Sequence, residues 1–137
     1  MDIFEILRKV DKQRHKADKV KVLKENETWA LKDIIRGSMD SNIKWKLPGG
    51  VPPYTPCEEH NYPASLHREH KQFVYLVQGQ NKCESLPAYK REKLFLGMLE
   101  GIHPQDALVL IDMINKKTPK GITRPIVEEA FPGLLTD

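Results

Sequence analysis

The chain has few of the features that mark exported, membrane-spanning or disulfide-stabilised proteins. Only two of its 137 residues are cysteines, too few for a dense disulfide framework, and we interpret both as thiols. No apolar run approaches the roughly 20 residues that cross a bilayer. The first residues are charged and lack the apolar core and cleavage site of an export signal. We therefore expect a cytoplasmic protein.

Motifs for common enzyme chemistry are also missing. The eight glycines are scattered where helices would stop, so no glycine-rich phosphate loop is present, and no serine lies in a nucleophile elbow. The side chains that resemble metal ligands are Cys57, His60, His67, His70 and Cys83. Because their spacing matches no established zinc pattern, we predict no catalytic residue, metal or other cofactor, and a metal-dependent hydrolase is the least favoured function.

Apolar residues recur at helical spacing along almost the whole chain. The pattern predicts a first short helix over residues 3–10, a helix capped by Asn26 that stops near Gly37, and further helices over 64–77 and 87–100. His103-Pro104 and Thr123 are typical helix starts. Prolines and glycines forbid regular structure over residues 47–63. The sequence therefore predicts an all-α fold, a compact single domain over residues 1–137 with about six to eight helices and one long internal loop.

Positive charge is concentrated in two segments, although the net charge is only +3. Eight cations face two acids between Arg8 and Lys24, and a second cluster runs from Lys116 to Arg124. Each cluster alone is equally well explained as a solvated helix surface. Together they favour an anionic partner only if folding brings them close to each other.

The second basic cluster lies where one helix ends and another begins. The free backbone N–H groups of a helix start, surrounded by cations, favour phosphate oxygens. We expect the N–H groups of Gly121, Ile122 and Thr123 to receive one phosphate, with a further bond from the Thr123 hydroxyl. Gly121 suits this position because it adopts positive φ and lets a backbone approach closely. The cations expected to neutralise neighbouring phosphates are Lys116, Lys117, Lys120 and Arg124.

Three segments carry a resemblance to a known family. They are LKENETWALKDIIRGS (residues 23–38), IKWKLPG (43–49) and GITRPIVEEAFPGL (121–134). In this order they resemble the small all-helical N-terminal DNA-binding domain of ATP-dependent DNA ligases, most closely those of T-even-type bacteriophages. The resemblance implies a domain that holds the duplex backbone on its minor-groove side while other domains join the ends. The Lys-x-Asp-Gly motif that ligases adenylate is absent, so the resemblance implies a stand-alone phage protein, in the host-cell cytoplasm, that does not seal nicks.

The sequence thus predicts a non-catalytic, sequence-independent protein that grips the phosphate backbone of double-stranded DNA. Arg36, Lys44 and Lys46 are expected to contact the same or the opposite strand. Trp29 is expected in the core, which leaves Trp45 and Tyr54 as the aromatics for stacking on unpaired bases. A different class of function stays open. It is a small phage protein-interaction factor that docks its basic surface on a host or viral replication or transcription enzyme.

Overall fold

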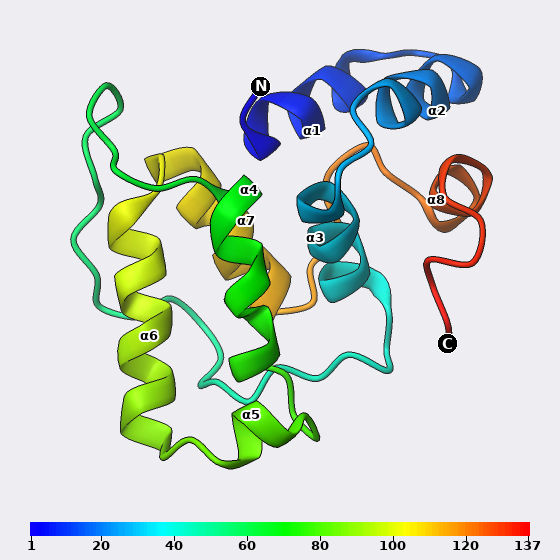
Figure 1. The fold of residues 1–137 in the computed structure, drawn as a ribbon. Helices are drawn as coiled ribbons and strands as arrows, with labels where there is room; N and C mark the ends of the chain where they lie inside the picture. Colours follow the sequence, from blue (N-terminus) through cyan, green and yellow to red (C-terminus); the bar gives the residue numbers. More distant parts are fainter.

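Eight α-helices and one 3₁₀ helix make up the regular structure of the computed structural model, which describes residues 1–137 (Figure 1). In chain order they are α1 (Ile3–Lys12), α2 (Lys16–Glu25), α3 (Trp29–Met39), α4 (Leu66–Glu69), η1 (His70–Tyr75), α5 (Asn81–Glu84), α6 (Ala88–Gly101), α7 (Pro104–Ile114) and α8 (Arg124–Ala130). Two isolated bridges are the only β pairing, so no sheet forms. The predicted all-α class and helix number are confirmed.

The helices surround one continuous apolar core, which is built mainly on α3 and α7. Helix α3 packs against α7 and α4, and α6 packs against α7. Helices α1 and α2 form a pair that covers one end of the molecule, where α2 also packs against α8 (Figure 1). Leu31, Ile34, Leu99 and Leu110 are fully buried between these elements. No helix has the length and hydrophobicity that a membrane span requires.

Several helix ends lie where the sequence predicts them. Pro87 precedes α6, which ends at Gly101. His103 occupies the N-cap of α7, where its ring Nδ1 accepts a hydrogen bond of 3.0 Å from the N–H of Gln105. Pro104 follows at the first helical position, where its missing N–H costs nothing. The His103 cap depends on local chemistry alone, because its ring bonds within its own turn, whereas the carbonyl of Gly101 accepts a hydrogen bond of 2.9 Å from the N–H of the distant Ala64.

Other helix ends differ from the prediction. Thr28, not Asn26, caps α3, and its hydroxyl accepts a hydrogen bond from the N–H of Leu31. Asn26 instead ends α2, and its side-chain amide donates to the carbonyl of Val22. Helix α3 continues past Gly37 to Met39. The helix predicted over 64–77 is shorter and changes from α to 3₁₀ within it, and the four-residue helix α5 was not predicted.

Irregular chain extends from residue 40 to residue 65, beyond both ends of the predicted loop. Arg91, which is only 6% exposed, fixes one part of it by donating to the carbonyl of Lys46 at 2.8 Å. Trp45 fixes another part. Its indole N–H donates to the carbonyl of Gly37 at 2.9 Å, and a Cβ on Gly37 would lie 2.5 Å from the Trp45 ring. Gly37 therefore permits the loop to pack on α3 and does not end the helix.

Candidate nucleic-acid interface

The two basic segments lie next to each other in the folded protein. The Lys19 ammonium on α2 donates a hydrogen bond of 2.7 Å to the carbonyl of Gly121. On α1, the Asp11 carboxylate lies 3.9 Å from the ammonium of Lys120. Residues about 100 positions apart in the sequence thus form one surface at the α1–α2 end of the molecule, beside α8 (Figure 1).

Gly121 adopts the predicted positive φ, at +80°. The close approach that excludes a side chain is to α1 of the same chain. A Cβ on Gly121 would lie 2.4 Å from Oδ1 of Asp11 and 2.8 Å from its Cα. The expectation that this glycine leaves room for a DNA backbone is corrected accordingly, since α1 occupies that space.

Only two of the three backbone N–H groups predicted to bind a phosphate are free to do so. Ile122 is buried, and its N–H donates to the carbonyl of Pro119 at 3.2 Å, so it is not free for a phosphate. The N–H groups of Gly121 and Thr123 have no hydrogen-bond partner within the chain. Thr123 is the N-cap of α8, but its exposed hydroxyl makes no capping bond. Because α8 has only seven residues, its dipole adds little to the site.

Lys116 binds backbone carbonyls of its own chain, whereas the sequence predicts that it neutralises a phosphate. Its ammonium donates to the carbonyls of Gly37, Asp40 and Ile43 at 2.7–2.9 Å. Burial lowers the pKa of Lys116, and the carboxylates of Asp40 and Asp137 partly oppose this effect. A cation at the carbonyl end of a helix is stabilising, and here it caps α3.

Arg124 is likewise engaged within the chain. Its guanidinium contacts Glu128 one turn later, at 3.0 Å, and binds both the side chain and the backbone carbonyl of Asp137. Hydrogen bonds to Asp137 raise the pKa of Arg124, and the same pairing holds the pKa of Asp137 far below its ordinary value. Arg124 therefore anchors the last residues on α8 and is not free to neutralise a phosphate.

Lys117 and Lys120 are the two cations of this turn that point into solvent. Both line a shallow groove of about 380 Å³ between α1, α7 and the turn. Lys117 forms no ion pair, and the side chain of Lys120 is 90% exposed. Arg8 of α1 lies in the same groove and is bound to Gln105 of α7, not to an acid. Leu108 is 49% exposed on the wall of this groove.

The other predicted DNA contacts lie apart from this turn, around the irregular segment that follows α3. Lys44 is exposed, whereas Lys46 forms an ion pair with Glu84 of α5. The hydrogen bond from Lys46 and another from the N–H of Gly79 lower the pKa of Glu84. Arg36 lines a second groove, between α3 and η1. The structure thus divides the predicted site into two regions.

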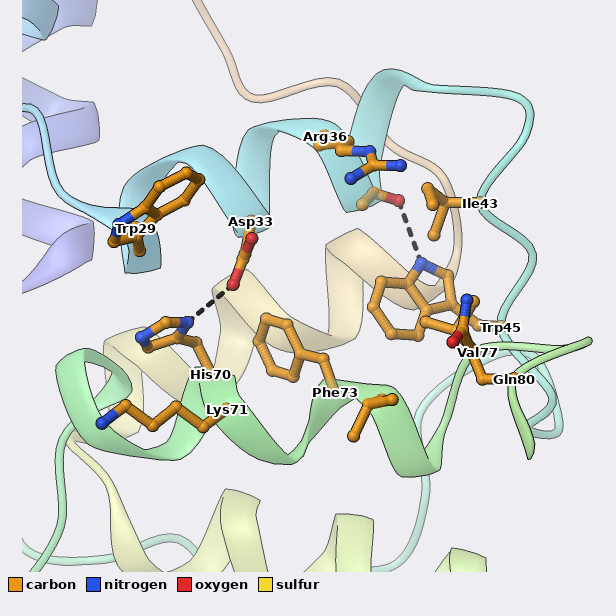
Figure 2. Close-up of a pocket in the computed structure, with 12 residues that line it drawn as sticks. Trp29, Asp33, Arg36, Ile43, Trp45, His70, Lys71, Phe73, Val77 and Gln80 are labelled. Atoms are coloured by element: carbon orange, nitrogen blue, oxygen red, sulfur yellow. Dashed lines mark hydrogen bonds and ion pairs between the residues drawn. The ribbon is translucent and has the colours of Figure 1, made fainter. Parts of the chain in front are cut away.

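This second groove has a volume of about 460 Å³ and is rich in aromatic side chains (Figure 2). Trp29 and Trp45 lie near its two ends, and Phe73 packs edge-on against Trp45, with ring centres 5.6 Å apart. Trp29 is 71% exposed, so its expected place in the core is wrong. Trp29 begins α3 beside the buried Ala30 and Leu31, but it lies on the side of the helix that faces the groove. Across the groove, His70 Nδ1 lies 2.6 Å from Oδ2 of Asp33.

The cysteines and histidines considered as metal ligands do not cluster at one site. No three or more His, Cys, Asp or Glu side chains are placed to share a metal ion. Cys57 donates to the carbonyl of Asn61, while Cys83 is buried in a different part of the fold. His67 is hydrogen-bonded to the carbonyl of Met1 and His70 to Asp33.

Comparison with known proteins identifies a family but no function. No curated protein matches the chain. The model of a family of unknown function, DUF6433, matches residues 6–120, which is most of the sequence. The resemblance to the ligase domain therefore stays a prediction. Because this match covers most of the chain, the chain belongs to the DUF6433 family.

Proposed function

We propose that this protein binds double-stranded DNA through its phosphate backbone, without reading sequence and without catalysis. The basic surface is formed by the α1–α2 pair and the turn before α8, which we call the basic end. The observation that carries the proposal is the contact of Lys19 with Gly121, because it joins the two cation-rich segments into one surface. A continuous set of cations along a surface is the usual footprint of a protein that binds nucleic-acid backbone.

The exposed cations of the basic end exceed those used in ion pairs. Lys9, Lys12, Arg14, Lys24 and Lys117 are exposed and have no acidic partner within ion-pair distance. The pairs that do form, such as that of Lys16 with Glu129 at 3.2 Å, join exposed side chains. Exposed pairs contribute about 0–1 kcal/mol each, so a phosphate can replace the carboxylate at little cost. These side chains can neutralise phosphates but carry no fixed pattern for base recognition.

The affinity for duplex should depend steeply on salt. If about four to six phosphates are neutralised, the logarithm of the binding constant should fall with the logarithm of salt concentration at a slope of about −4 to −5. Fluorescence anisotropy of a labelled random-sequence duplex over a range of salt concentrations measures this slope. A slope near zero, or absence of binding in dilute buffer, contradicts the proposal.

Reversal of the two solvent-facing cations of the turn, Lys117 and Lys120, tests where the duplex lies. We expect the double variant Lys117→Glu/Lys120→Glu to weaken duplex binding at least about tenfold at low salt, because each reversal removes one phosphate contact and adds a repulsion. Its free energy of unfolding should stay within about 0.5 kcal/mol per site. Binding is measured by anisotropy and folding by urea titration.

The matched control is Lys90→Glu/Lys93→Glu on α6, which changes the net charge equally on exposed lysines remote from the basic end (Figure 1). Equal loss of affinity in both double variants indicates a non-specific effect of net charge and contradicts the assigned surface. An unchanged duplex affinity in Lys117→Glu/Lys120→Glu favours the other candidate, in which the basic end docks on an acidic protein surface.

A further inference from the structure

We propose that the groove between α3 and η1 binds an unpaired nucleotide of a single-stranded nucleic acid, with its base on Trp29 and its phosphate at Arg36. The inference deepens the proposed function and rests on it, because it adds a single-stranded segment to the backbone that the basic end holds. The basis is the combination of aromatic surface and unmet cationic donors in one groove (Figure 2).

Trp29 supplies an exposed aromatic surface at the edge of the groove. Its side chain is 71% exposed, an unusual cost for the largest apolar side chain in a protein with an otherwise continuous core. The ammonium of Lys32 lies over one face of the ring, 4.9 Å from its centre, and is also paired with Glu27 at 3.3 Å. Stacking on aromatic side chains is the main way in which proteins bind unpaired bases of any sequence.

Arg36 supplies the donors for a phosphate. Trp29, Asp33 and Arg36 occupy positions i, i+4 and i+7 of α3 and therefore lie on one side of the helix, above the groove (Figure 2). The guanidinium of Arg36 makes no hydrogen bond in the chain. Its enclosed Nε has no hydrogen-bond partner, and its one ion pair is long, 3.8 Å to Oδ2 of Asp40. Arginine with free donors is suited to phosphate oxygens.

The charge of the groove matches an anionic ligand. Lys71 is exposed on the opposite wall and forms no ion pair. The single acid in the lining, Asp33, is hydrogen-bonded to His70, and the two cations Arg36 and Lys71 outnumber it. The groove volume of about 460 Å³ lies within the roughly 300–1,000 Å³ of typical small-ligand sites. An aromatic base and its phosphate therefore satisfy both the apolar and the cationic parts of the lining.

Tryptophan fluorescence tests the inference directly, because the only two tryptophans of the chain both line this groove. The full chain is titrated with oligothymidylate of about 12 nucleotides and with an abasic strand of equal length. We expect the base-bearing strand to quench the fluorescence and the abasic strand to leave it unchanged. Equal quenching by both strands shows that no base enters the groove and overturns the inference. Equal quenching by thymidine monophosphate at the same concentration overturns the assignment to a strand.

Substitution of Trp29 gives an independent readout. Trp29→Ala should lower the affinity for labelled oligothymidylate, followed by anisotropy, at least about fivefold. Trp29→Phe should restore part of it, and Tyr89→Ala, which removes an aromatic 66% exposed on α6, should have no effect. Unchanged affinity in Trp29→Ala overturns the inference. The two proposals fail separately, since Trp29→Ala should leave blunt duplex binding intact, whereas Lys117→Glu/Lys120→Glu should reduce it.

Discussion

Three charged side chains are almost fully buried, and each binds backbone groups of a distant segment. Asp106 on α7 accepts a hydrogen bond of 2.9 Å from the N–H of Phe4 in the first turn of α1. Arg91 donates to three carbonyls around the irregular segment and α5. Asp40 accepts from the backbone and hydroxyl of Thr136 near the last residue. Single residues thus fix segments that have little secondary structure of their own.

Asp106 makes stability depend on pH. Burial raises the pKa of Asp106 from its ordinary 3.8 to about 6, although the hydrogen bond from Phe4 opposes the shift. Between these two values the folded state retains a proton that the unfolded state has released. The stability contributed by this proton is fully present below about pH 4 and is lost as the pH rises through 6.

The variant Asp106→Asn should remove this dependence. The amide oxygen still accepts from Phe4, but no charge is buried above pH 6. We expect the variant to be more stable than the parent at pH 8 by up to roughly 3 kcal/mol, with the gain shrinking toward pH 4. Urea unfolding at a series of pH values measures the difference. A gain that is the same at pH 4 and pH 8 would show that ionisation of Asp106 is not its source.

At the scale of elements, the turn before α8 is shaped by its contact with α1. Gly121 combines a positive φ with a distance to Asp11 that leaves no room for a Cβ. Gly133 has the same φ of +80°, but a Cβ there meets no atom within 4 Å. A side chain at Gly133 would therefore meet only the strain of a positive φ, whereas a side chain at Gly121 would also collide with α1.

Gly121→Ala should destabilise the protein more than Gly133→Ala. For Gly133→Ala we expect the cost of the left-handed conformation alone, about 1 kcal/mol. Gly121→Ala should add displacement of α1 and cost about 2–4 kcal/mol in total. Thermal or urea unfolding of both variants gives the comparison, and equal costs would mean that the α1 contact is not tight in solution.

At the scale of the whole molecule, the neighbouring Lys116 and Lys117 have different roles. Lys116 links the end of α7 to the end of α3 and compensates the buried carboxylate of Asp40. Lys117 faces the groove at the basic end and touches no acid. One side chain is therefore part of the packed structure and the other is available to a partner.

Substitution of each lysine by methionine should separate stability from binding. Lys116→Met should lower the free energy of unfolding by roughly 1–2 kcal/mol, because three carbonyls, two of them partly buried, lose their donor, and should leave the salt slope of duplex binding unchanged. Lys117→Met should change stability by no more than about 0.5 kcal/mol and make the slope less negative by about 1. Urea unfolding and the anisotropy salt series measure both quantities. The reverse pattern would contradict the assignment of Lys116 to structure.

The sequence by itself determined the all-α class and most helix positions. Helical periodicity and the caps at His103 and Pro87 act within a few residues, so no knowledge of distant contacts is needed. The same local reasoning found the positive φ of Gly121 and the irregular segment. It misplaced Trp29 because an aromatic residue in an apolar stripe looks the same whether or not a neighbouring helix covers it.

Only the tertiary structure decided which cations are free and where they lie. The sequence alone does not distinguish Lys116, Lys117 and Arg124. In the fold, Lys116 is bound by carbonyls at the end of α3, and Arg124 is bound by the carboxylate of Asp137. The nearness of α2 to the turn at Gly121, and the groove between Trp29 and Arg36, arise from packing between segments far apart in the chain. Local interactions specify the helices, whereas long-range contacts select the side chains that remain exposed to a partner.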